Sequence, residues 1–197
     1  MTNVQDEADI KESWQAHAPL SDAQNYLQGW DPVVQKILNA TPSPLIDWKL
    51  VYRDALPHWT SPKSRIAIIG DAAHPFLPTS IQGASQAMED GVTISVCLKI
   101  SGKGRVQEAV ATFEALRYER VKAAQKTGEK TRDMWHNANW EKVKMDPESI
   151  KLERPAWLLN FDTEKYAEEN YAATAALIKD RNAAREYNLR AASDSTI

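Results

Sequence analysis

The sequence has one cysteine, few glycines and no long apolar run, and each scarcity excludes a class of protein. Cys97 is the only cysteine in 197 residues, so an internal disulfide framework is excluded. No segment approaches the ~20 apolar residues that a membrane-spanning helix needs. The net charge is −3 without a basic stripe, which argues against a nucleic-acid partner. The acidic N-terminus has no apolar signal segment, so we expect a soluble, cytoplasmic protein.

The seven glycines are too scattered to form a dinucleotide-binding loop. Such a loop needs the pattern G-x-G-x-x-G between a strand and a helix, because its backbone must approach a pyrophosphate closely. The only G-x-G here is Gly102–Gly104, which follows a predicted helix and lacks the third glycine. We interpret it as a turn between helices, so the sequence contains no recognisable pyrophosphate site.

What the sequence does contain is a series of helical patterns with two short strand patterns. Helices are predicted from apolar spacing and start signals over residues 9–18, 32–38, 83–100, 106–135 and 163–187. Alternation over 45–53 predicts a strand, with an antiparallel partner expected. The continuous run Ile66–Ile69 predicts a strand buried on both faces. Cys97 falls in an apolar helical run, which predicts a buried and inert thiol.

One carboxylate follows the predicted buried strand directly, and a glycine precedes the next helix. Asp71 would stand where open α/β sheets bind ligands, and a carboxylate accepts hydrogen bonds from sugar or polyol hydroxyls. Gly83, near the helix start, would add free N–H groups and a positive dipole end. The pair therefore suits a cofactor with a polyol and an electron-accepting end. The alternative stays open that Asp71 is a cap and Gly83 a plain turn residue.

The segment around these residues resembles a known motif. "GDAAHPFLPTSIQGASQAMED", residues 70–90, is similar to the flavin-contacting motif of the FAD-dependent aromatic-ring monooxygenases. Within this family of group A flavin monooxygenases, it is most like the salicylate-hydroxylase-like branch. "GWDPVVQKIL", "WKLVYRDALPHWT", "FEALRYERVKAAQ" and "PAWLLNFDTEKYAEE" resemble further segments of that branch, in the same order. The resemblance covers residues 13–169.

The resemblance implies roles for single residues. Asp71 would accept a hydrogen bond from the ribityl chain of FAD, and Pro78 would pack near the flavin edge where oxygen reacts. The backbone at the helix start would face the pyrimidine end of the flavin. The implied cofactor-binding residues are Gly70, Asp71, Pro78, Gln82, Gly83 and Ala84. No catalytic or metal-binding residue is implied, and His74 would be structural.

The resemblance also implies a fold and a function. The fold class is α/β, as the C-terminal part of a flavin-monooxygenase fold that is mostly helical with a short sheet remnant. Residues 1–62 would end a substrate domain, 63–104 would contact FAD, and 105–197 would form a helical extension. The function would be hydroxylation of an aromatic or related small metabolite with FAD, NAD(P)H and O2, in secondary metabolism. Without the pyrophosphate motif the chain is expected to be incomplete alone, and a partner chain would supply the N-terminal half.

Two departures from the family pattern stand out. Position 81 is Ile where related proteins usually have Gly or Ala, so its side chain would either crowd the flavin or turn away. Position 91 is Gly where Ala is usual, and inside a helix glycine costs about 1 kcal/mol relative to Ala.

Arg117 and Arg120, three residues apart, are expected to pack or to pair with Glu114 and Glu119.

Two other functions stay open. A truncated, non-catalytic paralogue would act as an interaction or stabilising subunit. A hydrolase would use Ser85, since residues 83–87 nearly spell the nucleophile elbow G-x-S-x-G. Against a hydrolase, Ala87 replaces the last glycine and the predicted strand ends more than a dozen residues earlier.

Overall fold

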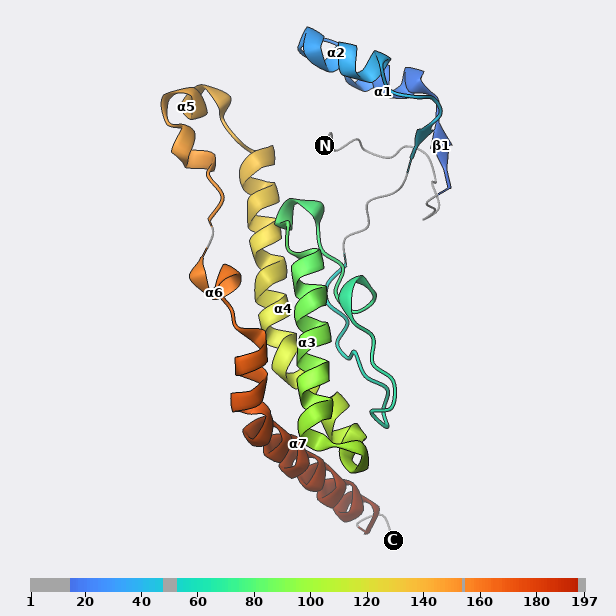
Figure 1. The fold of residues 1–197 in the computed structure, drawn as a ribbon, viewed down its shortest axis with the longest axis vertical. Coiled ribbons are helices and arrows are strands. Elements are labelled where there is room, and N and C mark those ends of the chain that lie inside the picture. Colours follow the sequence, from blue (N-terminus) through green and yellow to red (C-terminus); the bar gives the residue numbers. More distant parts are fainter. Residues whose placement is uncertain (1–14, 48–52, 154, 195–197) are drawn as a thin grey trace. The chain divides into compact units, whose positions relative to one another are not determined.

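The chain divides into two units, Met1–Val51 and Tyr52–Ile197. The first unit contains short strands and helices. The computed structural model describes residues 15–47, 53–153 and 155–194. In the first unit, strand β1 (His17–Ala18) pairs antiparallel with strand β2 (Leu45–Ile46). Helices α1 (Leu20–Tyr26) and α2 (Pro32–Asn39) lie between these strands in the sequence (Figure 1).

The start signal of α2 is confirmed. Asp31 precedes Pro32, and its carboxylate accepts a hydrogen bond from the Val33 N–H at 2.8 Å. The antiparallel strand at 45 is confirmed for its first two residues, and residues 48–52 lie outside the described ones. The helix predicted to reach residue 18 is wrong at its end, because Ala18 precedes Pro19 and is therefore restricted to extended backbone.

The second unit is built from three long helices joined by short helical turns. The long helices are α3 (Gly83–Ser101), α4 (Val106–His136) and α7 (Thr163–Asp194). The shorter helices are α5 (Trp140–Met145) and α6 (Ala156–Leu159). Single 3-10 turns are η1 (Gly70–Ala72), η2 (Pro78–Ser80), η3 (Lys103–Arg105) and η4 (Pro147–Ile150). All three long helices were predicted from the sequence, to within a few residues at most ends.

Helix α3 packs along α4, and α7 packs against both (Figure 1). Their contact forms the apolar core, together with the loop that precedes η1. The buried members of this core are Trp59, Ala73, Val96, Cys97, Ala109, Phe113, Leu116, Val121, Ala167 and Tyr171. Trp59 and Ala73 come from the segment before α3, so the core holds η1 in place against the helices.

The predicted buried strand over Ile66–Ile69 is wrong for this structure. One bridge joins Thr60 to Ala67, and the side chains of Ile66 and Ile69 are 67% and 42% exposed. The Ile66 carbonyl accepts from the Ser61 N–H, which pairs this segment along one edge. A strand buried on both faces needs neighbouring strands and covering layers, and the described residues supply a neighbour on one edge only. The chain is therefore mostly helical with a short sheet remnant, as predicted.

Candidate functional site

The turn that carries Asp71 is fixed tightly onto helix α3. Gly70 opens η1 with φ of +59°, a conformation that residues with a side chain rarely adopt. A Cβ on Gly70 would stand 3.2 Å from the Ala87 Cβ, so the backbone of the turn lies close against α3. The Gly70 carbonyl accepts hydrogen bonds from the N–H groups of Ala73 and His74, each at 2.9 Å. The next side chain, that of Asp71, is exposed.

The start of α3 lies beside this exposed carboxylate. A Cβ on Gly83 would stand 3.8 Å from the Asp71 Oδ1 and 3.4 Å from the Phe76 Cβ. The first N–H groups of α3 have no carbonyl partner within the helix, and they carry the positive end of its dipole. The structure thus brings together the carboxylate acceptor and the helix start that the sequence singled out.

The other predicted site residues lie on the same segment. Pro78 begins η2 and is exposed, and Ala84 is exposed in the first turn of α3. Gln82 is buried, and its N–H donates to the Ser80 Oγ at 3.2 Å. Because Asp71, Pro78 and Ala84 are all exposed, the segment forms an open wall.

Ile81 stands in this wall in a strained conformation. Its φ and ψ are 54° and 24°, the left-handed region in which a β-branched side chain is unfavourable. The side chain is 68% exposed. The backbone conformation explains physically why glycine would suit this position.

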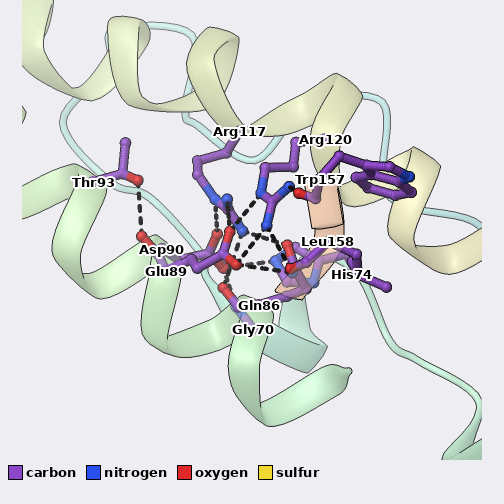
Figure 2. A network of polar contacts seen from close by, with 10 residues as sticks. All are labelled: Gly70, His74, Gln86, Glu89, Asp90, Thr93, Arg117, Arg120, Trp157 and Leu158. Atoms are coloured by element: carbon purple, nitrogen blue, oxygen red, sulfur yellow. Dashed lines mark hydrogen bonds and ion pairs between the residues drawn. The ribbon is translucent and has the colours of Figure 1, made fainter. Parts of the chain in front are cut away.

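Beneath the wall lies a buried network of polar side chains, which centres on Asp90 of α3 (Figure 2). The Asp90 Oδ2 accepts from the Gly70 N–H at 3.0 Å and lies 2.6 Å from the His74 Nε2. The Asp90 Oδ1 accepts from the Arg117 Nε of α4 at 2.9 Å. Arg117 also donates to the side-chain oxygen of Gln86 at 2.7 Å. Asp90, His74 and Arg117 are essentially inaccessible to solvent, so these contacts join η1, α3 and α4 away from water.

A second carboxylate, Glu89, extends the network to α6 (Figure 2). Its two oxygens accept from the Nε and Nη2 of Arg120, both at 2.8 Å, and it also pairs with Arg117. Arg120 Nη1 donates to the Trp157 carbonyl at 2.7 Å. The Arg120 guanidinium lies 3.6 Å from the centre of the Phe161 ring, a cation–π contact.

The two carboxyl groups are held in their charged form. Burial by itself would raise the pKa of Asp90, but hydrogen bonds from His74, Gly70 and Arg117 outweigh burial and lower this pKa below its ordinary value. Burial likewise opposes ionisation of Glu89, and the contacts from Arg120 and Arg117 lower the pKa of Glu89. Both groups therefore act as anions that pair with the guanidinium groups of Arg117, which is buried, and Arg120, which is partly buried.

The network was largely missed from the sequence. Packing was expected for Arg117 and is confirmed, but the predicted partners Glu114 and Glu119 are wrong, because the arginines face Asp90 and Glu89 on the neighbouring helix. Spacing along one helix finds local pairs and cannot find partners 27 to 31 residues away. The available signal was the Glu89-Asp90 pair inside the 70–90 motif, since acidic residues in a packed helix need buried cations.

Two further sequence expectations concern Cys97 and Ser85. Cys97 is fully buried, which confirms the predicted burial, and burial raises the pKa of its thiol to about 12, as expected for an unreactive thiol. Ser85 lies in the first turn of α3 and follows a helical turn, not a strand. Within the described residues no strand leads directly into this turn, so the strand–turn–helix arrangement of a nucleophile elbow is absent there, and His74 is engaged with Asp90.

Other features lie apart from the wall. A hollow of about 540 Å3 between the loop near Lys63, helix α4 and helix α7 contains none of the predicted site residues. Within the described ranges, no group of three or more His, Cys, Asp or Glu side chains is placed to hold a metal ion. Among the helices whose residues are described, none has the length and apolarity required to cross a membrane.

Comparisons with curated proteins find relatives from fungi. The FAD-dependent monooxygenase mdpD of Emericella nidulans is 36% identical over 180 residues, which cover 88% of this chain and 34% of that protein. The FAD-dependent monooxygenase nanF of Aspergillus nanangensis is 37% identical over 89% of this chain and 39% of its own length. The chain thus spans little more than a third of the relatives that it matches. No family model matches the chain.

Comparisons with solved structures find proteins of the same fold. CtdE in complex with FAD and a substrate is 36% identical with a TM-score of 0.77, over 88% of this chain and 42% of that one. FqzB is 31% identical with a TM-score of 0.75, over 89% of this chain and 41% of that one. A substrate complex of salicylate hydroxylase, at 22% identity and a TM-score of 0.64, shares the fold.

Proposed function

Because the chain matches a C-terminal region of FAD-dependent monooxygenases in sequence and fold, we propose that it forms one wall of the flavin site of such an enzyme. The observation that carries this proposal is the meeting of the Asp71 carboxylate with the start of α3 at Gly83. In this proposal, residues 63–104 contact the cofactor. Residues 1–62 form the end of a substrate domain, and residues 105–197 form a helical extension.

The residues present fit the ring and polyol end of FAD. The Asp71 carboxylate is exposed, and no hydrogen bond or ion pair engages it within the described residues, so it is free to accept from hydroxyl groups. A side chain at Gly83 would fill the space between Asp71 and Phe76, and glycine leaves this space open. The N–H groups at Gly83 and Ala84 would face an electron-rich ring edge.

The chain's own residues would bind and orient the cofactor. FAD, when bound, supplies the redox and oxygen chemistry. Asp71 would hold the ribityl chain, and Pro78 would limit access of water beside the ring. The dipole at the start of α3 would favour negative charge that develops near Gln82, Gly83 and Ala84. No side chain of the chain is required as a nucleophile or a base.

The wall is open, and this supports the proposal that the chain needs further polypeptide to hold FAD tightly. The sequence has no G-x-G-x-x-G loop for the pyrophosphate. Large apolar side chains near the wall are exposed, with Ile66 at 67% and Met88 at 68%. A second polypeptide with the nucleotide-binding segment would supply the missing contacts and cover these side chains. The same exposed side chains favour the alternative of a non-catalytic interaction subunit.

For the complete enzyme we propose hydroxylation of an aromatic or related small metabolite with NAD(P)H and O2. The relatives, which are FAD-dependent monooxygenases, support the monooxygenase reaction, while the aromatic substrate and NAD(P)H are proposed from the resemblance of residues 70–90 to the family motif. Residues 13–50, as the end of the substrate domain, would contribute a wall of the substrate site at most.

The test is a titration of FAD into the purified chain, followed by flavin fluorescence, with Asp71→Asn and Asp54→Asn in parallel. We expect affinity weaker than micromolar, lowered about 10-fold in Asp71→Asn, since a hydrogen bond to a charged group is lost, and unchanged in the exposed control Asp54→Asn. Sub-micromolar affinity of the chain alone would contradict the open-wall argument. Equal affinity in Asp71→Asn would contradict the assigned site. NAD(P)H oxidation, measured with and without candidate partner chains, separates the enzyme from the interaction subunit.

A further inference from the structure

The η1 turn depends on a single buried carboxylate for its shape. Gly70 has a positive φ, and its N–H donates to the Asp90 Oδ2 at 3.0 Å. His74, at the other end of the same turn, lies 2.6 Å from that oxygen through its Nε2. One oxygen of Asp90 therefore holds both ends of the segment 70–74, and Asp71 is the first exposed side chain between them.

The other oxygen of Asp90 is fixed from α4. Arg117 Nε donates to the Oδ1 at 2.9 Å, and Arg117 Nη2 donates to Gln86 one turn earlier on α3. Arg117 also pairs with Glu89, and Glu89 accepts two hydrogen bonds from Arg120 (Figure 2). Since a planar guanidinium fixes both distance and direction, Asp90 has no freedom to rotate away from the turn.

Solvent does not compete for these contacts. The side chains of Asp90 and His74 are 0% exposed, and that of Arg117 is 2% exposed. Burying an ion pair in this way is rarely the best route to stability, because desolvation offsets the attraction. Such a pair does fix the relative positions of the groups that it joins, and here it fixes the position of the η1 turn.

From these contacts we infer that Asp90 is a positioning residue, which holds the η1 turn so that Asp71 presents its carboxylate to the polyol of the cofactor beside Gly83. This inference rests on the proposed function for the identity of the ligand. The positioning itself concerns residues 70–74 and can be measured without any ligand.

The matched control for Asp90 is Glu114 of α4. Its carboxylate also fixes a loop, by accepting from the Trp59 N–H and the Thr60 Oγ1, both at 2.8 Å. Within the described residues Glu114 makes no hydrogen bond or ion pair with the η1 turn, so Glu114→Gln leaves the contacts between Asp90 and that turn in place. Asp90→Asn keeps the shape of the side chain, removes its charge and replaces one acceptor oxygen with a donor.

The experiment measures amide hydrogen exchange by NMR in the full chain, for the native sequence, Asp90→Asn and Glu114→Gln. We expect Asp90→Asn to speed exchange at Gly70, Ala73 and His74 by about 10- to 100-fold relative to amides in the middle of α4, as one hydrogen bond to a charged acceptor is lost. Glu114→Gln should leave these three amides unchanged. A uniform increase over all amides, or no increase at the turn, would overturn the inference.

If Asp90→Asn does not fold, His74→Gln replaces it, because that variant leaves the Arg117–Asp90 pair intact. The same localised increase is then expected at Ala73 and Gly70, and a uniform increase again counts against positioning. FAD affinity gives a separate readout, which Asp90→Asn should weaken as much as Asp71→Asn does. If the native chain shows no FAD binding even at millimolar FAD, the proposed flavin contact of Asp71 fails, while the exchange data still decide the role of Asp90.

Discussion

The close packing of helix α4 against the η2 turn at Gly128 predicts the outcome of a single added methyl group. Gly128 lies inside α4 and faces η2, the turn that begins with Pro78. A Cβ on Gly128 would stand 2.6 Å from the Ser80 Cβ and 3.2 Å from the Ser80 Cα, which is closer than real Cβ atoms come. These atoms cannot swing aside by rotation of a flexible side chain. Gly128→Ala therefore requires the turn or the helix to move.

The magnitude follows from two opposing effects. Alanine is preferred over glycine inside a helix by about 1 kcal/mol, while overpacking of a tight contact costs about 1–3 kcal/mol. We expect Gly128→Ala to lower the free energy of unfolding by about 1 kcal/mol. Gly91→Ala in α3 is the matched control, since its Cβ would meet nothing within 4 Å. It should raise the free energy of unfolding by up to about 1 kcal/mol.

The assay is urea denaturation of the full chain, followed by far-UV circular dichroism, for both variants and the native sequence. The expected difference between the variants is about 2 kcal/mol, from the two effects above. Equal stabilisation in Gly128→Ala and Gly91→Ala would refute the close packing of η2 on α4, and with it the anchoring of the wall at Pro78.

Three further predictions test other parts of the structure. Ile81→Gly should raise the free energy of unfolding by about 0.5–1 kcal/mol in the same assay, because relief of the left-handed strain exceeds the entropy cost of glycine; a loss would show that the Ile81 side chain contributes to packing. Folding lowers the pKa of Asp90 and of Glu89. The stability that these carboxylates contribute is therefore fully present above their pKa in the unfolded chain, about 4, and is lost as the pH falls through their lower pKa in the folded chain. The midpoints of urea denaturation, measured from pH 7 to acid pH, should show this loss, and they should depend less steeply on pH in Asp90→Asn. Cys97, with its pKa raised to about 12, should react with a thiol reagent only after unfolding, and rapid labelling of the native chain would contradict its burial.

The sequence predicted those features that depend on neighbours in the chain. Local helical patterns predicted α3, α4 and α7, and the Asp31-Pro32 pair predicted the start of α2. The segment 70–90 pointed to Asp71 and Gly83, which the structure places side by side. Each of these signals is carried within about 20 residues.

Features that depend on distant partners were missed or wrong. The continuous apolar run 66–69 predicted a buried strand, but burial requires neighbours that the described residues supply on one edge only. The network of Asp90 and Arg117 joins positions 27 residues apart, on helices whose relative rotation no local pattern specifies. The left-handed backbone of Ile81, directly after η2, was not predicted either, because a β-branched residue gives no local signal for that conformation.

Amide NMR shifts during an FAD titration show whether the exposed carboxylate of Asp71 and the start of α3 contact a flavin. With FAD raised to millimolar concentration, we expect shifts that are largest at Asp71, Gly83 and Ala84 and that are strongly reduced in Asp71→Asn. Shifts confined to residues around the hollow near Lys63 and Lys179, or no shift at the wall, would contradict this contact.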